Sequence, residues 1–227
     1  MKIGILQTGH FVPELVPSLG DYSALYAQML DGYDFEFQTF SVVDMEFPDG
    51  PGAADGWLIS GSKHGAYEDH PWIAPLEQLI RDIQASGRPM IGVCFGHQII
   101  AQALGGKVEK FQRGWSVGAT DYQFGDDTLT LNAWHQDQVT QAPDGAKLEA
   151  TNDFCKFAAL SYGDKIYTVQ AHPEFEAAAV DGLIRTRGDS VSQKDVLEQA
   201  QNKLGRALAN KVMAEKLANV LRQGVTE

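Results

Sequence analysis

The sequence contains no long apolar run and only two cysteines among its 227 residues. A membrane-spanning helix needs about 20 consecutive apolar residues, and no segment approaches that length. Two cysteines are too few for a disulfide framework, and the apolar run at Met1–Leu6 is too short for a secretory signal. We therefore expect a protein of the reducing cytoplasm that does not insert into a membrane.

Basic residues are also scarce. Lys and Arg number 18 against 30 Asp and Glu, which gives a formal net charge of −12. An excess of negative charge is repelled by phosphate backbones and by anionic lipid surfaces, so we expect neither nucleic acid nor a membrane as a partner. This charge does not exclude a small zwitterionic ligand.

Two patterns that would indicate a cofactor are missing. The chain has no Walker-type glycine loop for a nucleotide phosphate. His10, His64 and His70 stand in apparent loops and lack the paired spacing of metal ligands. We therefore expect a site that holds no metal and needs no cofactor.

The first half of the chain alternates short apolar runs with amphipathic stretches. Residues 3–7, 35–42 and 57–60 are typical of strands, whereas 22–30 and 72–86 are typical of helices. This alternation predicts an α/β fold of three layers, a mostly parallel sheet with helices on both faces. At this length we expect a single domain spanning residues 1–227.

The second half of the chain has other patterns. Residues 107–170 hold short alternating segments separated by turns, which predict a small antiparallel addition that returns to the sheet. The chain after Glu174 has helical character. Apolar residues at helical spacing predict one long C-terminal helix that packs through Val196, Leu197, Ala200, Leu204, Leu208 and Val212.

A glycine-framed cysteine is the most informative feature. Gly92-Val93-Cys94-Phe95-Gly96 follows an apolar run, 89–91, and precedes a helical segment, 98–104. A sharp strand-to-helix turn of this pattern is the cysteine form of a nucleophile elbow, in which glycines allow close approach of the backbone. The helix N-terminus also favours a thiolate. The alternative is a small buried core residue, which is how we interpret Cys155, since it has no glycine frame.

A thiolate nucleophile needs a base, and the base needs an orienting acid. His172-Pro173-Glu174 follows the apolar strand 165–170, and a His and a Glu two residues apart at a strand end can project toward one site. Taken alone, this tripeptide is also typical of a surface helix start with Glu near the N-terminus.

Together these motifs resemble the class I glutamine amidotransferases. Residues 94–98 resemble the nucleophile motif of that family, and residues 170–174 its second motif. Residues 59–62 resemble its oxyanion turn, and residues 134–137 the loop that holds the amino-acid end of glutamine.

The resemblance implies a role for each matching residue. Cys94, His172 and Glu174 would form a catalytic triad, and the backbone N–H groups of Gly61 and Phe95 an oxyanion hole. The residues that would bind substrate are Gln98, Trp134, Gln136 and Asp137. His135 would either orient this loop or be a structural histidine, and we take His97 as structural.

The activity implied is that of a glutamine amidotransferase. The Cys94 thiolate would form a γ-glutamyl thioester and release ammonia, for which a separate synthetase subunit would be the acceptor. Residues 42–48, 60–62 and 94–98 look closest to stand-alone members, which include plant γ-glutamyl peptidases. Lys63 belongs to a turn, 61–65, in which many family members have a proline after the glycine. A γ-glutamyl peptidase acting on a larger γ-glutamyl small molecule is therefore one alternative, and a non-catalytic binding module is another.

Overall fold

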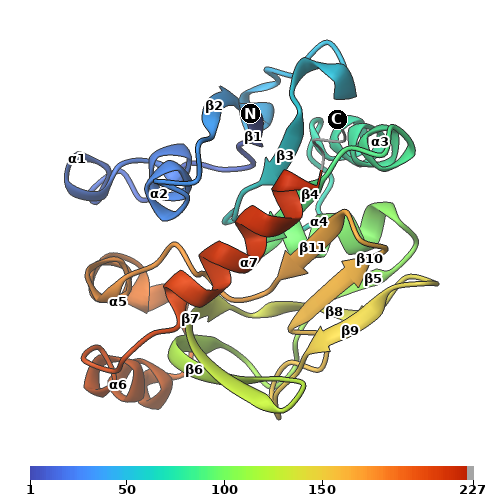
Figure 1. Cartoon of the computed structure of the whole chain (residues 1–227). Coiled ribbons are helices and arrows are strands. Elements are labelled where there is room, and N and C mark those ends of the chain that lie inside the picture. The colour runs from blue at the N-terminus through green and yellow to red at the C-terminus, as the bar shows by residue number, and fades with distance from the viewer. Residues whose placement is uncertain (224–227) are drawn as a thin grey trace.

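The computed structural model describes residues 1–223 and contains a central sheet of seven strands in the order β2-β1-β3-β4-β11-β10-β9 (Figure 1). Five neighbouring strands run parallel, and two at one edge are antiparallel. The parallel strands are β1 (Lys2–Leu6), β2 (Glu36–Phe40), β3 (Gly56–Ile59), β4 (Met90–Val93) and β11 (Ile166–Val169). The antiparallel strands are β10 (Ala159–Tyr162) and β9 (Lys147–Ala150).

Two separate antiparallel pairs stand beside the main sheet. Strand β5 (Lys107–Lys110) pairs with β8 (Asp137–Gln141), and β6 (Ser116–Phe124) pairs with β7 (Asp127–His135). A bridge between Asn132 and His172 connects β7 to the segment that follows β11. The predicted α/β fold, with a mostly parallel sheet and a small antiparallel addition, is confirmed.

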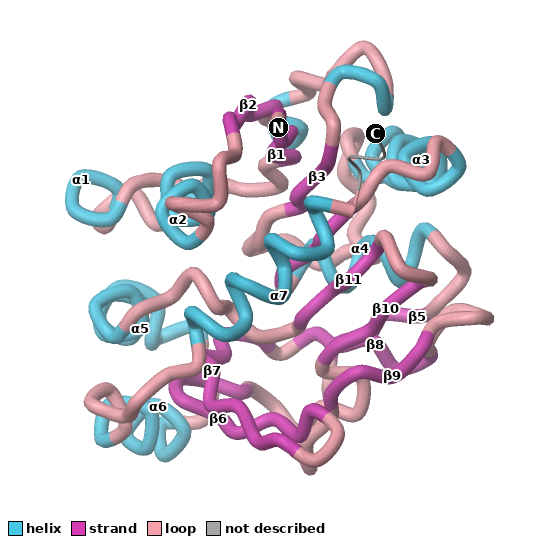
Figure 2. The backbone as a smooth tube through the Cα atoms, viewed as in Figure 1, coloured by secondary structure: helices cyan, strands magenta, loops and turns pink. Residues whose placement is uncertain are grey.

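Helices cover both faces of the main sheet (Figure 2). The two faces follow from the alternation of side chains along each strand. On β4, Ile91 and Val93 join one core cluster, and on β3, Trp57 and Ile59 join the other. The first cluster includes side chains of α2 (Tyr22–Met29), α5 (Ala177–Arg187) and α7 (Asn210–Arg222). The second includes those of α3 (Ile73–Ala85) and α4 (Phe95–Ala103).

The remaining helical segments are short. They are α1 (Val16–Leu19), α6 (Lys194–Asn202) and three 3₁₀ turns at Val42–Asp44, Pro51–Ala53 and Gly188–Ser190. None of the helices within residues 1–223 is long and apolar enough to cross a membrane.

The prediction of one long C-terminal helix is wrong. Of the apolar residues assigned to it, three lie in α6 and only Val212 lies in α7, while Leu204 and Leu208 belong to the segment that connects the two helices. The two helices pack on different parts of the molecule. Ala200 of α6 lies against Gly118 of β6, whereas α7 packs on the main sheet. Between them the N–H of Ala209 donates to the carbonyl of Thr130 in β7 at 2.8 Å, a bond that a continuous helix would not make.

The core face of α7 supplies a stability test. Leu217 is fully buried in the first cluster, and Val212 on the same helix is 56% exposed. We expect Leu217→Ala to lower the free energy of unfolding by about 2–5 kcal/mol, because it leaves a cavity in the core. Val212→Ala should change it by less than about 0.5 kcal/mol. Urea denaturation of both variants measures the difference, and equal losses would contradict this packing of α7.

Candidate functional site

The carboxyl ends of four parallel strands meet at one edge of the sheet. The residues that follow β1, β3, β4 and β11 include Thr8, Ser60, Cys94 and His172. Hydrogen bonds hold these segments together. The N–H of Thr8 donates to Ser60 Oγ at 2.9 Å, and the N–H of Cys94 donates to the carbonyl of Val169 at 2.8 Å. Ligands of open α/β sheets bind at this edge.

Cys94 stands at the turn from β4 into α4. Its backbone has φ 53° and ψ −102°, a strained conformation for a residue with a side chain. The two flanking glycines make the turn possible. A Cβ at Gly92 would lie 2.6 Å from the backbone carbon of Gly96, and a Cβ at Gly96 would lie 2.2 Å from the carbonyl oxygen of Ile59. Only glycine at both positions lets the first turn of α4 approach β3 so closely.

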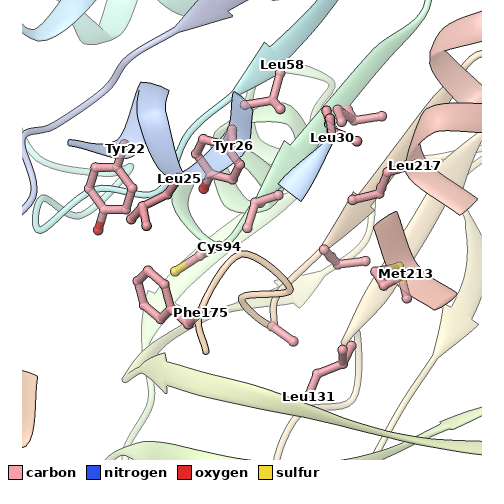
Figure 3. Packing of buried hydrophobic residues seen from close by; sticks show 14 of the residues in the cluster. Tyr22, Leu25, Tyr26, Leu30, Leu58, Cys94, Leu131, Phe175, Met213 and Leu217 are labelled. Atoms are coloured by element: carbon pink, nitrogen blue, oxygen red, sulfur yellow. The ribbon is translucent and has the colours of Figure 1, made fainter. Parts of the chain in front are cut away.

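His172 and Glu174 form a buried pair beside this turn. Nδ1 of His172 lies 2.6 Å from Oε1 of Glu174, and both side chains are buried. The imidazole is stacked on the ring of Phe175, with centroids 4.1 Å apart and planes 1° from parallel. Figure 3 shows Cys94 and Phe175 in the core cluster that also contains Tyr22 and Tyr26 of α2.

The electrostatic surroundings favour a protonated His172. Burial by itself lowers the pKa of this imidazole. The negative charges of Glu174 and Cys94, together with hydrogen bonds to both side chains, outweigh burial and raise the pKa to about 10. Gln170 also donates from Nε2 to the sulfur of Cys94 at 3.6 Å. The sulfur of Cys94 therefore lies beside a protonated imidazole and the side-chain amide of Gln170.

Tyr26 connects the buried carboxylate of Glu174 to the turn at Gly61. Its hydroxyl donates to Oε1 of Glu174 at 2.9 Å and accepts from the N–H of Gly61 at 3.0 Å. The side chain is completely buried. The sequence gives no sign of this role for Tyr26, because Tyr22 and Tyr26 look like an ordinary apolar face of a helix.

The contact with Tyr26 corrects the expected role of Gly61. The N–H of Gly61 is engaged by the tyrosine hydroxyl rather than directed into the cavity. The next residue, Ser62, lines the cavity, and within residues 1–223 its N–H makes no hydrogen bond. The Phe95 N–H lies in the first turn of α4, where helical amides have no intrahelical partner.

Four further residues expected at the site line the same cavity. They are Gln98, Trp134, Gln136 and Asp137. Gln98 donates from Nε2 to the carbonyl of Asp137 at 2.8 Å and to Oε1 of Gln170 at 3.1 Å. Its amide therefore fixes the junction of β7 and β8 to α4. Oδ2 of Asp137 accepts from the hydroxyl of Tyr67 at 3.1 Å, and partial burial raises the pKa of this carboxyl.

Two histidines near the site differ in their surroundings. His135 lines the cavity and is buried, and neither ring nitrogen has a hydrogen-bond partner in the described part of the chain. Burial, followed by the charge of His172, lowers its pKa to about 3, so the ring is neutral. His97 lies outside the cavity lining, and its Nδ1 lies 2.7 Å from Oγ1 of Thr168, which supports a structural role.

The cavity has a volume of about 380 Å³ and opens beside Cys94. Lys63, Lys110 and Arg187 also line it, are exposed, and form no salt bridge within the described residues. Cys155 is buried outside this lining, and burial raises the pKa of its thiol to about 12. Cys94 is therefore the thiol that a ligand in the cavity can reach.

The hydrogen bonds of Tyr26 provide a test of this geometry. Tyr26→Phe keeps the ring and removes the hydroxyl that holds Glu174 and Gly61. We expect kcat for γ-glutamyl amide hydrolysis to fall roughly tenfold, since a hydrogen bond to a charged group contributes about 1.5–3 kcal/mol. Steady-state kinetics measure the effect. Tyr167→Phe is the matched control, because this buried tyrosine lies outside the cavity lining and its hydroxyl has no hydrogen-bond partner among residues 1–223. An unchanged kcat in Tyr26→Phe would remove Tyr26 from the support of the site.

Comparison with known proteins adds independent information. The family model for glutamine amidotransferase class-I matches residues 35–184. Gamma-glutamyl peptidase 3 of Arabidopsis thaliana is 27% identical over 223 residues, covering 90% of each chain. A glutamine-hydrolyzing GMP synthase of Limosilactobacillus reuteri is 34% identical over 130 residues, which cover 52% of this chain and 24% of the relative.

The fold also matches that of a solved structure. The crystal structure of a glutamine amido transferase from Methylobacillus flagellatus superposes with a TM-score of 0.78 at 20% identity, covering 100% of this chain and 95% of the other. The family model spans most of the parallel sheet and includes Cys94, His172 and Glu174. The chain belongs to the class-I glutamine amidotransferase family.

Proposed function

We propose that this chain hydrolyses the side-chain amide of glutamine through a γ-glutamyl thioester on Cys94. The observation that carries the proposal is the cysteine in a glycine-framed turn beside the buried pair of His172 and Glu174. Membership of the amidotransferase family supports the choice of a γ-glutamyl amide as substrate.

The first half of the reaction forms the thioester. The thiolate of Cys94 attacks the carboxamide carbon, and the carbonyl oxygen gains a negative charge. The N–H groups of Ser62 and Phe95 are the amides available to that oxygen, and one such donor contributes about 3–4 kcal/mol in the transition state. His172 gives its proton to the departing nitrogen, the C–N bond breaks, and ammonia leaves.

The second half releases glutamate. His172, now neutral, takes a proton from water, and the hydroxide attacks the thioester carbon. The C–S bond breaks and returns the thiolate of Cys94. Glu174 keeps the imidazole in one tautomer and stabilises its positive charge during both steps. No step in this sequence needs a metal or an organic cofactor.

A second candidate function is hydrolysis of γ-glutamyl peptides by the same chemistry. The specific observation in its favour is the group of cations around the cavity, Lys63, Lys110 and Arg187, in a chain of net charge −12. Glutamine leaves only ammonia, whereas a γ-glutamyl peptide leaves an amine that bears its own carboxylate. The similarity to gamma-glutamyl peptidase 3 over 90% of both chains supports this candidate.

A separate ammonia acceptor is part of the first candidate. The similarity to GMP synthase supports such an acceptor. This chain covers only 24% of the length of that relative, so most of the relative has no counterpart in this chain. A synthetase subunit that receives the ammonia would make glutamine hydrolysis faster in its presence. A γ-glutamyl peptidase would show no such dependence.

The nucleophile is tested with the second cysteine as its control. Cys94→Ala should lower hydrolysis by at least about 10³-fold, as loss of a nucleophile does in comparable sites, whereas Cys155→Ala should retain most of it. A glutamine-analogue diazoketone should label Cys94 in the unmodified protein, as peptide mapping by mass spectrometry would show. Label on Cys155, or none on either cysteine, would overturn the proposal.

The leaving amine is tested with a matched pair of substrates, γ-glutamylglycine and γ-glutamylglycinamide, which differ in a single carboxylate. If the cations around the cavity bind that carboxylate, Lys63→Gln and Arg187→Gln should each raise KM for γ-glutamylglycine about 2–5-fold. This is the effect expected from the loss of a partly exposed ion pair. Neither should change KM for the amide. Lys211→Gln, remote from the cavity, is the control. A higher kcat/KM for glutamine than for both dipeptides would contradict the second candidate.

A further inference from the structure

Three side chains that commonly bind metals lie together in the loop between β3 and α3. One potential ligand atom from each of His64, Glu68 and His70 lies within 4.8 Å of the other two. Oε2 of Glu68 is 2.8 Å from Nε2 of His70 and 3.5 Å from Nδ1 of His64. The sequence predicted no metal site because these residues lack a regular spacing, but the loop brings them to one place.

We propose that His64, Glu68 and His70 bind Zn²⁺, or a divalent transition metal of similar preference, at the rim of the cavity. Zinc ligands in proteins lie about 2.0–2.2 Å from the ion, so two ligands of a tetrahedral site are about 3.3 Å apart. The two separations from Glu68, 2.8 and 3.5 Å, lie on either side of that value. Small side-chain rotations would bring the three atoms into coordination.

The rings are held in place by a buried neighbour. His70 is stacked on Trp72, with centroids 5.8 Å apart and planes 6° from parallel, and His64 meets the same ring edge-on at 5.8 Å. Trp72 is 3% exposed. Within the loop, the N–H of Glu68 donates to the carbonyl of Gly65 at 3.1 Å. These contacts restrict the orientation of both rings and of the loop that carries them.

The three side chains supply a donor set that suits the ion. Two imidazole nitrogens and one carboxylate oxygen are ligands that zinc accepts, and zinc sites with three protein ligands hold water in the fourth position.

The proposed ion would lie next to the site already described. His64 and Glu68 line the cavity that contains Cys94, and Trp72 packs on Phe95, the residue after that cysteine, with ring centroids 5.5 Å apart. The site is separate from the hydrolytic groups and does not depend on the proposed function. It would place a divalent cation at the entrance to the cavity.

The test is zinc titration by isothermal calorimetry in a Cys94→Ala background, which removes the thiol as a competing ligand. We expect one Zn²⁺ per chain. His64→Gln and, separately, Glu68→Gln should each weaken binding at least about tenfold. His10→Gln is the matched control. His10 contacts Asp21 through one ring nitrogen, at 2.7 Å, and Asp44 through the other, at 2.9 Å, so these groups cannot converge on one ion.

A variant enters the comparison only if its midpoint of thermal unfolding without zinc equals that of the Cys94→Ala protein. His64→Gln and Glu68→Gln leave the stacking of His70 on Trp72 intact, so the result does not depend on a variant that disturbs the core. Absence of stoichiometric binding at free zinc up to about 100 µM, where a micromolar site would be saturated, would overturn the proposal. Stoichiometric binding that both variants retain at full affinity would overturn it equally.

Discussion

The first turn of α4 lies directly against the carboxyl end of β3, and the geometry of the site depends on that contact. Gly96 leaves no room for a side chain next to the carbonyl of Ile59, and its own N–H donates to the carbonyl of Ser60 at 3.1 Å. The close approach forces the positive φ of Cys94 at the strand-to-helix turn. Backbone strain of this kind costs about 1–3 kcal/mol and persists only where surrounding structure enforces it. Here the segments at the ends of β3 and β11 enforce it, because they accept the hydrogen bonds of Gly96 and Cys94.

Buried charge is the second constraint on this edge. A carboxylate and an imidazolium removed from water lose hydration, and the loss is offset only by good geometry and further hydrogen bonds. Oε1 of Glu174 meets this requirement through His172 and through the hydroxyl of Tyr26, whereas Oε2 is buried without a hydrogen-bond partner among residues 1–223. The same hydroxyl accepts from the N–H of Gly61, so the turn at Gly61 and the carboxylate share one support. A change in α2 would therefore reach both groups, although α2 contributes no group that reacts.

The cavity combines a rigid floor with a charged rim. Its floor is formed by strand ends and by the buried side chains of Cys94, Gln98 and His172, which are fixed by hydrogen bonds between neighbouring elements. Its rim carries exposed Lys63 and Arg187 on loops or helix ends. Cys94, Gln98 and His172 belong to the segments, 94–98 and 170–174, whose sequences resemble motifs of the family. A preference for one leaving amine over another would therefore depend on residues at the rim of the cavity, since loops can vary in sequence without disturbing the sheet.

The sequence by itself determined the alternation of strands and helices, the turn at Cys94 and the placement of His172 two residues before Glu174, because each depends on residues close together in the chain. Apolar alternation sets strand and helix, glycines at 92 and 96 set the turn, and one proline separates the histidine from the glutamate. Local patterns of this kind carry their own physical cause.

Only the tertiary structure decided the features that join distant segments. Tyr26 meets Glu174 across 148 positions of the chain, and its bond to Gly61 redirects an N–H that the motif alone assigned to the oxyanion hole. The break between α6 and α7 follows from a hydrogen bond of Ala209 to β7, which no helical periodicity reveals. The cluster of His64, Glu68 and His70 forms because the loop folds against Trp72. A contact between residues far apart in sequence leaves no periodic signal, since its energy depends on the packing that brings the residues together.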